Sequence, residues 1–154
     1  MAMQSDSSAG SYDFAALGEE SGELERLQLQ ARRSAELELQ LLRRMGLKDG
    51  LDVLDLACGP GVITRLIAES HPSSRVTAMD LNEALLEQAK SEAVAVGLNT
   101  IHFVRGDVYQ PPLPEASFDF IYARLLFQHL DQPSKALDQV RRLLKPGGCL
   151  CIMD

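Results

Sequence analysis

The sequence predicts an α/β fold built on a parallel β-sheet, and three observations lead to this class. First, short apolar runs of strand length alternate with longer segments of helical composition after Gly50. Second, each strand segment is nearly all apolar, which is typical of a sheet with helices on both faces. Third, the strands alternate with helices at the spacing of right-handed crossovers, which join parallel strands.

Length, charge and composition make several classes of protein less consistent with this sequence. The chain has 154 residues, enough for one self-standing core. Its 15 basic and 22 acidic residues give a net charge of −7, which disfavours a nucleic acid as partner. No stretch approaches the roughly 18–20 apolar residues of a membrane span, and the first residues lack the pattern of a secretory signal. Three cysteines cannot all pair, which favours a reduced, cytoplasmic setting.

The first third of the chain is predicted as a tail followed by a helix. Residues 1–18 are predicted to be a flexible tail, because their start is polar and serine-rich. Residues 19–46 form a helical segment rich in Leu, Glu, Gln and Arg, and Gly46 would end it. The apolar spacing loses its period at residues 32–34, which predicts a break or bend there. Residues 47–154 form the α/β domain.

The elements of this domain follow from apolar spacing, glycines and prolines. Apolar runs predict strands at residues 53–57, 75–79, 101–105, 118–123 and 149–153. The helical spacing predicts helices at residues 60–70, 82–96 and 133–144. Gly97 would stop the second helix, and Pro133 suits the first position of the third. Three prolines between residues 111 and 114 force an irregular loop, and Lys145-Pro-Gly-Gly148 is predicted as a turn.

Acidic residues and glycines gather where the predicted strands end. Asp55 and the glycines at 59 and 61 close the first strand, Asp80 follows the second, and Asp107 follows the third. Each aspartate alone suits a turn or a helix cap. Grouping like charges at one edge costs energy unless a ligand compensates for it. Because ligands of parallel sheets bind outside the carboxyl ends of the strands, this edge is the predicted site.

The residue types at this edge discriminate between two ligands that contain a ribose. A dinucleotide site has the pattern Gly-x-Gly-x-x-Gly/Ala with an acid about 20 residues later. Gly59, Gly61 and Asp80 match, but the third position is Thr64. Asp55 disfavours a pyrophosphate and favours an ammonium or sulfonium group. A ribose diol with a cationic tail describes S-adenosylmethionine, and an NAD(P)-dependent oxidoreductase is the weaker alternative.

The segment Val53-Leu-Asp-Leu-Ala-Cys-Gly-Pro-Gly61 resembles the first motif of the class I S-adenosylmethionine-dependent methyltransferases. Four further segments follow in the family's order and spacing, so the resemblance covers about residues 45–154: Met79-Asp80, Gly106-Asp107, Phe118 to Arg124, and Leu144 to Gly148. It implies a Rossmann-like three-layer sandwich with strand order 3-2-1-4-5. The family's sheet usually has seven strands, so the last two are expected to be absent and the domain truncated after its fifth strand.

The resemblance implies how the first strand and its glycine loop bind the cofactor. Asp55 would hold the methionine ammonium group. The backbone of Ala57, Gly59 and Gly61 would pack along the methionine and the ribose. Asp80 would accept hydrogen bonds from both ribose hydroxyls, since a carboxylate has two oxygens. After methyl transfer the same residues would hold the product, S-adenosyl-L-homocysteine.

The resemblance also assigns roles at the following strand ends. Leu81 would contact the adenine face, Asp107 would accept from the adenine amino group, and the Val108 N–H would donate to a ring nitrogen. The Ala123 carbonyl would meet the methionine ammonium group. Two roles are open for Arg124: it binds the cofactor carboxylate or it covers the site.

Other candidates carry a functional and a structural interpretation. Tyr12 precedes the first helix, where similar methyltransferases fold a lid over the cofactor, and packing is its alternative. His129 is a weak candidate for a catalytic base, because residues near this position often only shape the pocket. Cys58 is interpreted as a buried filler and not as a nucleophile. Cys149, Cys151 and the histidines lack metal-ligand spacing, so no metal is expected.

The implied function is methyl transfer to a small-molecule acceptor. The alternative from another class is a non-catalytic module that binds S-adenosylmethionine or S-adenosylhomocysteine. No aromatic cage, metal site or basic groove identifies the acceptor. The fifth strand, residues 149–153, would be an apolar sheet edge without charge or proline. This edge, or the first helix, is predicted to join two copies in a homodimer.

Overall fold

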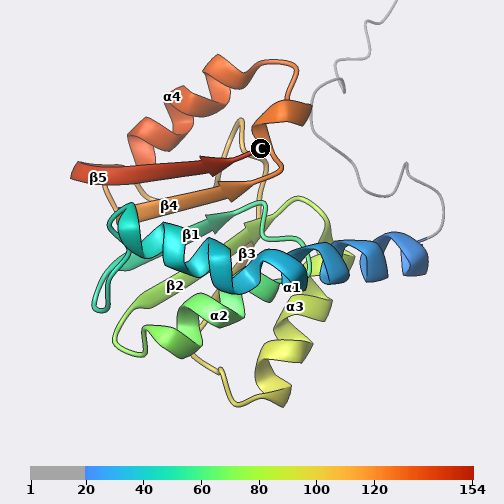
Figure 1. Cartoon of the computed structure of the whole chain (residues 1–154). Coiled ribbons are helices and arrows are strands. Elements are labelled where there is room, and N and C mark those ends of the chain that lie inside the picture. Colours follow the sequence, from blue (N-terminus) through green and yellow to red (C-terminus); the bar gives the residue numbers. More distant parts are fainter. Residues whose placement is uncertain (1–19) are drawn as a thin grey trace, which may run out of the picture.

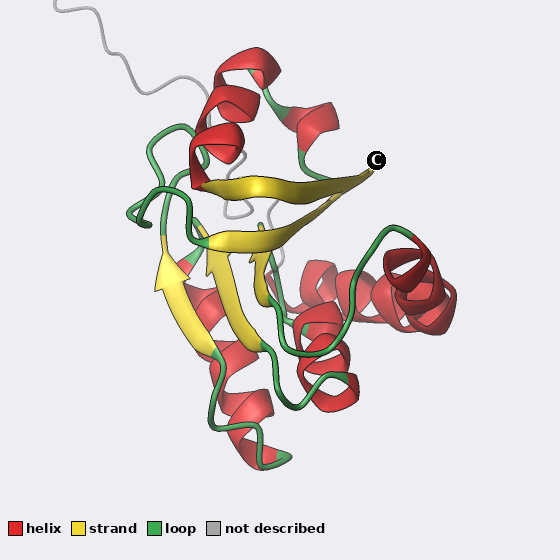
Figure 2. Cartoon of the chain, turned by 90° about the vertical axis from the view of Figure 1, so that its left-hand side faces the viewer, coloured by secondary structure: helices red, strands yellow, loops and turns green. Residues whose placement is uncertain are grey.

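A computed structural model describes residues 20–154 of the chain (Figure 1). A central β-sheet lies between helices on both of its faces (Figure 2). One apolar cluster joins the sheet to the first three helices, and a second joins its other face to the last helix. None of the helices in residues 20–154 has both the length and the apolar character that a bilayer crossing requires.

The five strands form one parallel sheet in the order β3-β2-β1-β4-β5, as predicted. The strands are β1 (Asp52–Leu56), β2 (Arg75–Asp80), β3 (His102–Arg105), β4 (Phe118–Arg124) and β5 (Leu144–Met153). The register pairs Leu56 with Met79 on one side and with Ala123 on the other. The carboxyl ends of β1, β2 and β4 therefore lie level at one edge of the sheet.

The helices begin and end close to the predicted residues. They are α1 (Glu20–Arg44), α2 (Val62–Ser70), α3 (Glu83–Ala95), α4 (Pro133–Leu143) and a short 3₁₀ turn, η2 (Phe127–His129), that the sequence did not predict. Gly61 precedes α2 in the left-handed conformation, which delays the helix to Val62. The side chain of Asn82 caps α3 by accepting a hydrogen bond from the Leu85 N–H at 3.2 Å.

Two local predictions differ from the structure. A break at residues 32–34 was wrong, because α1 is one continuous helix that no glycine or proline interrupts between residues 23 and 45, and the alternative of a bend stays a prediction. Residues 144–148 belong to β5 and are not a separate turn. They bulge against β4, since Leu144 pairs with Phe118 and Cys149 with Phe120. Ion pairs anchor this bulge, because Lys145 Nζ lies 2.6 Å from Asp52 and 2.9 Å from Asp119.

The edge position of β5 follows from the strand order. Its partner on one side is β4, and Ile152 is 41% exposed. The other end of the sheet is β3. The helix α1 packs against α2 and exposes Leu37 and Leu41 on its surface one turn apart, and Met45, directly after the helix, is exposed as well. Both surfaces named for a homodimer are therefore apolar and exposed in this structure.

Candidate functional site

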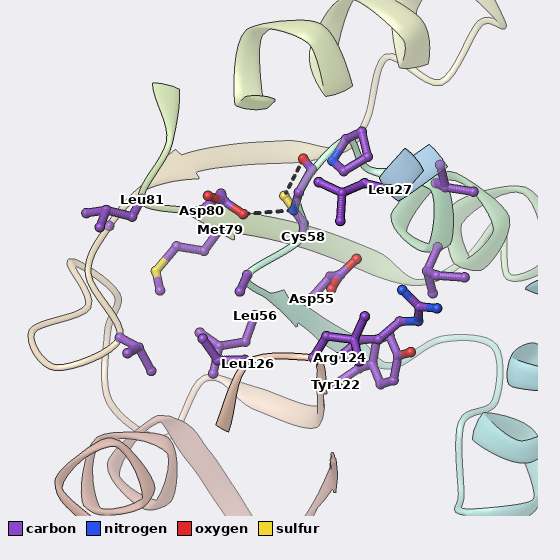
Figure 3. A pocket seen from close by; sticks show the side chains of 18 of the residues that line it. Leu27, Asp55, Leu56, Cys58, Met79, Asp80, Leu81, Tyr122, Arg124 and Leu126 are labelled. Atoms are coloured by element: carbon purple, nitrogen blue, oxygen red, sulfur yellow. Dashed lines mark hydrogen bonds between the residues drawn. The ribbon is translucent and has the colours of Figure 1, made fainter. Parts of the chain in front are cut away.

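A cavity opens at the carboxyl ends of β1, β2 and β4, and α1 contributes Leu27 to its wall (Figure 3). Most of the residues that the sequence nominated for a cofactor line this cavity. They are Asp55, Ala57, Gly59, Asp80, Leu81, Asp107, Val108 and Arg124. The topology brings them together because parallel strands end at the same edge of the sheet.

Among the described residues, three of the predicted site residues do not line the cavity, and a fourth, Tyr12, lies outside the described part of the chain. The backbone of Gly61 caps α2, and a Cβ there would lie 2.8 Å from the Ala89 Cβ, so this glycine permits α2 and α3 to approach. Ala123 is fully buried in the sheet. His129 is exposed at the end of η2. Tyr12, together with the predicted tail and lid, lies outside the described residues.

The loop after β1 adopts an unusual backbone that shapes one wall. Ala57 and Gly59 have left-handed φ values of 61° and 53°. The Cys58 N–H donates to the Met79 carbonyl at 3.0 Å, which ties the loop to β2. A Cβ on Gly59 would meet nothing within 4 Å, so glycine leaves open space beside the backbone.

Asp80 is the buried acid at the end of β2, with 5% exposure. Its Oδ2 accepts a hydrogen bond from the Gly59 N–H at 2.8 Å, and its Oδ1 accepts one from the Asn82 N–H at 2.9 Å. Burial raises the pKa of this carboxyl, while the backbone donors oppose the shift. Each oxygen keeps a further lone pair, so the carboxylate can accept from two ligand hydroxyls at once.

Asp55 is buried more deeply, with 2% exposure. Thr64 Oγ1 donates to its Oδ2 at 2.5 Å, which gives a function to the residue that departs from the dinucleotide pattern. Burial raises the pKa of Asp55 to about 7, the charges of Asp80 and Glu38 add to the rise, and Arg124 opposes it. The cavity therefore holds more buried negative charge than its own cation neutralises, which suits a cationic ligand.

Sequence reasoning missed a polar cluster that joins α1 to β4. Glu38 is 3% exposed, and its carboxylate accepts from the Tyr122 hydroxyl at 3.0 Å and from Arg124 Nε at 2.8 Å. A signal was present, because Ala35, Glu38 and Leu42 share one face of α1 at helical spacing and are all buried. A glutamate on an apolar helix face requires a buried partner.

Two further side chains at the cavity have structural contacts. Asp107 Oδ1 accepts a hydrogen bond from the Tyr109 N–H at 2.9 Å, which orders the loop after β3. Burial raises the pKa of the Cys58 thiol well above its usual range, and the charges of Asp55 and Asp80 act in the same direction. A thiol in this state is a poor nucleophile, in agreement with the interpretation of Cys58 as a filler.

A second cavity adjoins the first and shares Arg124 and Leu125 with it. The helix α1 contributes Arg26, Leu29 and Gln30 to its wall. Leu125 has a left-handed φ of 51°, which is uncommon for a side chain of this size. This strained residue lies where the two cavities meet, and strained backbone of this kind clusters at ligand sites.

Known proteins share this fold and this motif. A family model described as "Methyltransferase domain" matches residues 54–152. Over 118 residues the chain is 36% identical to a sterol 24-C-methyltransferase of Gibberella zeae, covering 76% of this chain and 31% of that protein. It is 34% identical over 119 residues to a malonyl-[acyl-carrier protein] O-methyltransferase of Pseudescherichia vulneris, covering 77% and 43%.

A solved structure resembles the whole arrangement. It is a SAM-dependent methyltransferase from Aquifex aeolicus with a TM-score of 0.78 and 26% identity, covering 85% of this chain and 70% of that one. The chain spans less than half the length of the two curated relatives. The family match contains β2, β4 and the end of β1, and with them every residue that lines the acidic cavity except Leu27.

Proposed function

Because the chain belongs to the S-adenosylmethionine-dependent methyltransferases, with S-adenosylmethionine as cofactor, we propose that it is the cofactor-binding part of an enzyme that methylates a small molecule. The observation that carries the proposal is the acidic cavity at the strand ends. Two buried aspartates, Asp55 and Asp80, face it from adjacent strands. A ligand with a diol and a cationic group offers a partner to each aspartate: the diol donates hydrogen bonds to one carboxylate, and the cationic group pairs with the other.

The residues present fit each part of this cofactor. Asp80 accepts from the ribose hydroxyls with the lone pairs that Gly59 and Asn82 leave. Asp55 pairs with the methionine ammonium group, which relieves the burial of its charge. The open space beside Gly59 admits the chain between ribose and methionine.

The adenine and the amino acid end engage the rest of the cavity. Leu81 contacts the adenine face, Asp107 accepts from its amino group, and the Val108 N–H donates to a ring nitrogen. In this proposal the Ala123 carbonyl accepts a hydrogen bond from the methionine ammonium group, and the Ala123 side chain is buried in the sheet. Arg124 binds the cofactor carboxylate or covers the site.

When bound, the cofactor supplies a methyl group on a sulfonium, which is already a good leaving group. The protein's task is therefore to hold the methyl in line with the acceptor atom and to exclude water. Leu27, Leu126 and Leu130 supply apolar wall for this purpose. His129, exposed on η2, is a weak candidate for a base.

The acceptor approaches through the second cavity, which shares Arg124 and Leu125 with the cofactor cavity. The relatives named above act on a sterol and on a malonyl group carried by a protein, so the family tolerates different acceptors on one cofactor site. A small molecule is the acceptor class we propose for this chain.

A second copy of the chain is the proposed partner, joined through the β5 edge or the exposed face of α1. The exposed apolar side chains of Ile152, Leu37 and Leu41 support this. Sedimentation at several concentrations tests it, and a monomer at high concentration would contradict it. The three cysteines are unpaired, which supports a reducing, cytoplasmic location.

Calorimetric titration of S-adenosylhomocysteine into the purified chain tests the cofactor assignment. We expect saturable binding, and Asp80→Ala should weaken it by about 100-fold, because two charge-assisted hydrogen bonds are lost. Asp138→Ala, the same change at an exposed position of α4, is the matched control. NAD(H) serves as the competing ligand. Absence of binding by folded protein, or equal binding by the Asp80 variant, contradicts the proposal.

A further inference from the structure

Three buried carboxylates and one half-buried cation lie at the cofactor cavity and at the second cavity that adjoins it. Asp55 and Asp80 line the first cavity, Glu38 lines the second, and Arg124 lines both. Glu38 on α1, Asp55 on β1 and Asp80 on β2 are each at most 5% exposed. Among the described residues that line the cavity, Arg124 is the one basic side chain. The partner that Arg124 takes therefore decides which carboxylate is left for a cationic ligand.

Arg124 takes Glu38. Its Nε donates to Glu38 Oε1 at 2.8 Å, and the Tyr122 hydroxyl holds the other oxygen at 3.0 Å. Tyr122 is fully buried on β4, directly opposite Asp55 in the sheet register. Two donors from one strand thus hold the Glu38 carboxylate, and Figure 3 shows Arg124 and Tyr122 close to Asp55.

Asp55 is the competing partner for this guanidinium. The charge of Arg124 lowers the pKa of Asp55 and the charge of Glu38 raises it, so the three groups act on one another. Arg forms strong, frequently bidentate pairs with carboxylates. If Glu38 lost its charge, the half-buried guanidinium would turn to Asp55, because a charge partly removed from water is unfavourable without a partner.

We propose that Glu38 is a positioning residue of the cofactor site: by holding Arg124, it keeps the Asp55 carboxylate available for the ammonium group of the cofactor. The inference rests on the proposed function and names a residue on α1, outside the motifs that follow the strands. It also gives α1 a role, because the same contact fixes the helix whose Leu27 lines the cavity.

The proposal predicts that the protein releases protons from Asp55 when the ligand binds. The groups that act on Asp55 come from every element packed against it: Glu38 on α1, Cys58 in the loop, Thr64 on α2, Asp80 on β2, and Tyr122 and Arg124 on β4. With its pKa near 7, the Asp55 carboxyl is partly protonated at neutral pH. Pairing with an ammonium group requires the ionised form, so binding releases a proton.

The test is calorimetry of S-adenosylhomocysteine at pH 7 in two buffers of different ionisation enthalpy, which counts the protons released. The wild type should release about half a proton, as a pKa near 7 requires. Glu38→Gln should weaken binding by roughly tenfold and abolish the release, because Arg124 then pairs with Asp55. Glu36→Gln, an exposed change on the same helix, should match the wild type.

The double variant Glu38→Gln with Arg124→Gln separates this account from a merely structural role. With the competing cation removed, proton release should return. If Glu38→Gln weakens binding but still releases the wild-type number of protons, or if the double variant does not restore the release, the proposal is wrong. Should Glu38→Gln fail to fold, Glu38→Asp replaces it. We expect reduced release, because the shorter acid reaches Arg124 poorly, and unchanged release contradicts the proposal.

The wild-type titration distinguishes the two levels of inference. If the folded wild type does not bind S-adenosylhomocysteine, the proposed function fails and the role of Glu38 falls with it. If the wild type binds and the Glu38 variants release protons as it does, only the positioning role fails. 5′-Methylthioadenosine, which lacks the amino acid end, should bind without releasing a proton.

Discussion

Each end of β1 carries an aspartate, and the surroundings of these two aspartates shift their pKa values in opposite directions. At the amino-terminal end, Asp52 receives Arg75 Nη2 at 2.7 Å and Lys145 Nζ at 2.6 Å. The Arg75 guanidinium, with Lys145, lowers the pKa of Asp52 to about 2. At the carboxyl-terminal end, Asp55 has the Thr64 hydroxyl, and burial raises its pKa to about 7.

The difference separates a carboxylate that is paired within the fold from one that we propose to pair with a ligand. Asp52 and Asp119 share Lys145, so this end of the sheet neutralises its own charge and fixes the bulge of β5. At the other end, burial raises the pKa of Asp55, which makes ionisation of this carboxyl unfavourable and a cationic ligand favourable. The end of the sheet, and not the residue type, decides the role.

The largest expected effect is on the pH dependence of stability. Asp55 is ionised in the unfolded chain above a pKa near 3.8 but holds its proton to about pH 7 when folded. The free energy of unfolding of the ligand-free protein should therefore fall between pH 4 and 7, by on the order of 4 kcal/mol from this group. Urea unfolding measures it.

The variant Asp55→Asn should remove this part of the pH dependence. Asp80 shifts in the same direction, so a residual fall will remain. Identical pH profiles for the variant and the wild type would show that Asp55 is not held protonated, and would break the contrast with Asp52.

A smaller effect is expected on binding. Asp55→Asn should weaken the binding of S-adenosylhomocysteine by about 100-fold, because a neutral amide cannot balance the positive charge of the ligand's ammonium group. Binding of 5′-methylthioadenosine, which has no such group, should be nearly unchanged. Equal losses for the two ligands would mean that the substitution disturbs the site as a whole.

The same change at the amino-terminal end of β1 should lower the stability of the protein and leave its affinity for S-adenosylhomocysteine unchanged. Asp52→Asn should lower the free energy of unfolding at pH 7 by about 1–2 kcal/mol, since the pair with the exposed Arg75 is partly screened. The folded pKa of Asp52 is depressed, so its contribution is present above about pH 4 and is lost as pH falls toward 2. Calorimetry with S-adenosylhomocysteine is the check, and a large loss of affinity would count against the comparison.

The smallest effect concerns the loop after β1. Ala57 sits at a φ of 61°, where an L-residue with a Cβ is strained. Ala57→Gly should therefore stabilise the protein by about 1 kcal/mol in urea unfolding. A destabilised variant would indicate that the entropy of the unfolded glycine outweighs the relief of strain.

The fold was predictable because its determinants are local. Apolar runs and glycine stops located every strand, and the resemblance supplied their order. One error arose where distant contacts overrode a local signal. Lys145-Pro-Gly-Gly has the composition of a turn, but the ion pairs of Lys145 with Asp52 and Asp119 hold it in β5.

The residues of the candidate site also divide into those that local sequence predicted and those that only distant contacts bring together. Asp55, Asp80 and Asp107 were predictable as lining residues because each lies within two residues of the end of a strand. Glu38 and Tyr122 were not, because 84 residues separate them along the chain and only the packing of α1 on the sheet joins them. Thr64 was noticed as a departure from a motif, but its hydrogen bond to Asp55 required the structure.

The most direct test of the central claim is the affinity of the wild type for S-adenosylhomocysteine between pH 5 and pH 8. If Asp55 is kept for the cofactor's ammonium group, affinity should rise by about tenfold per pH unit from pH 5 and level off above about pH 7. Asp55→Asn should show no such rise. An affinity that is constant with pH, or that falls as pH increases, would contradict the account.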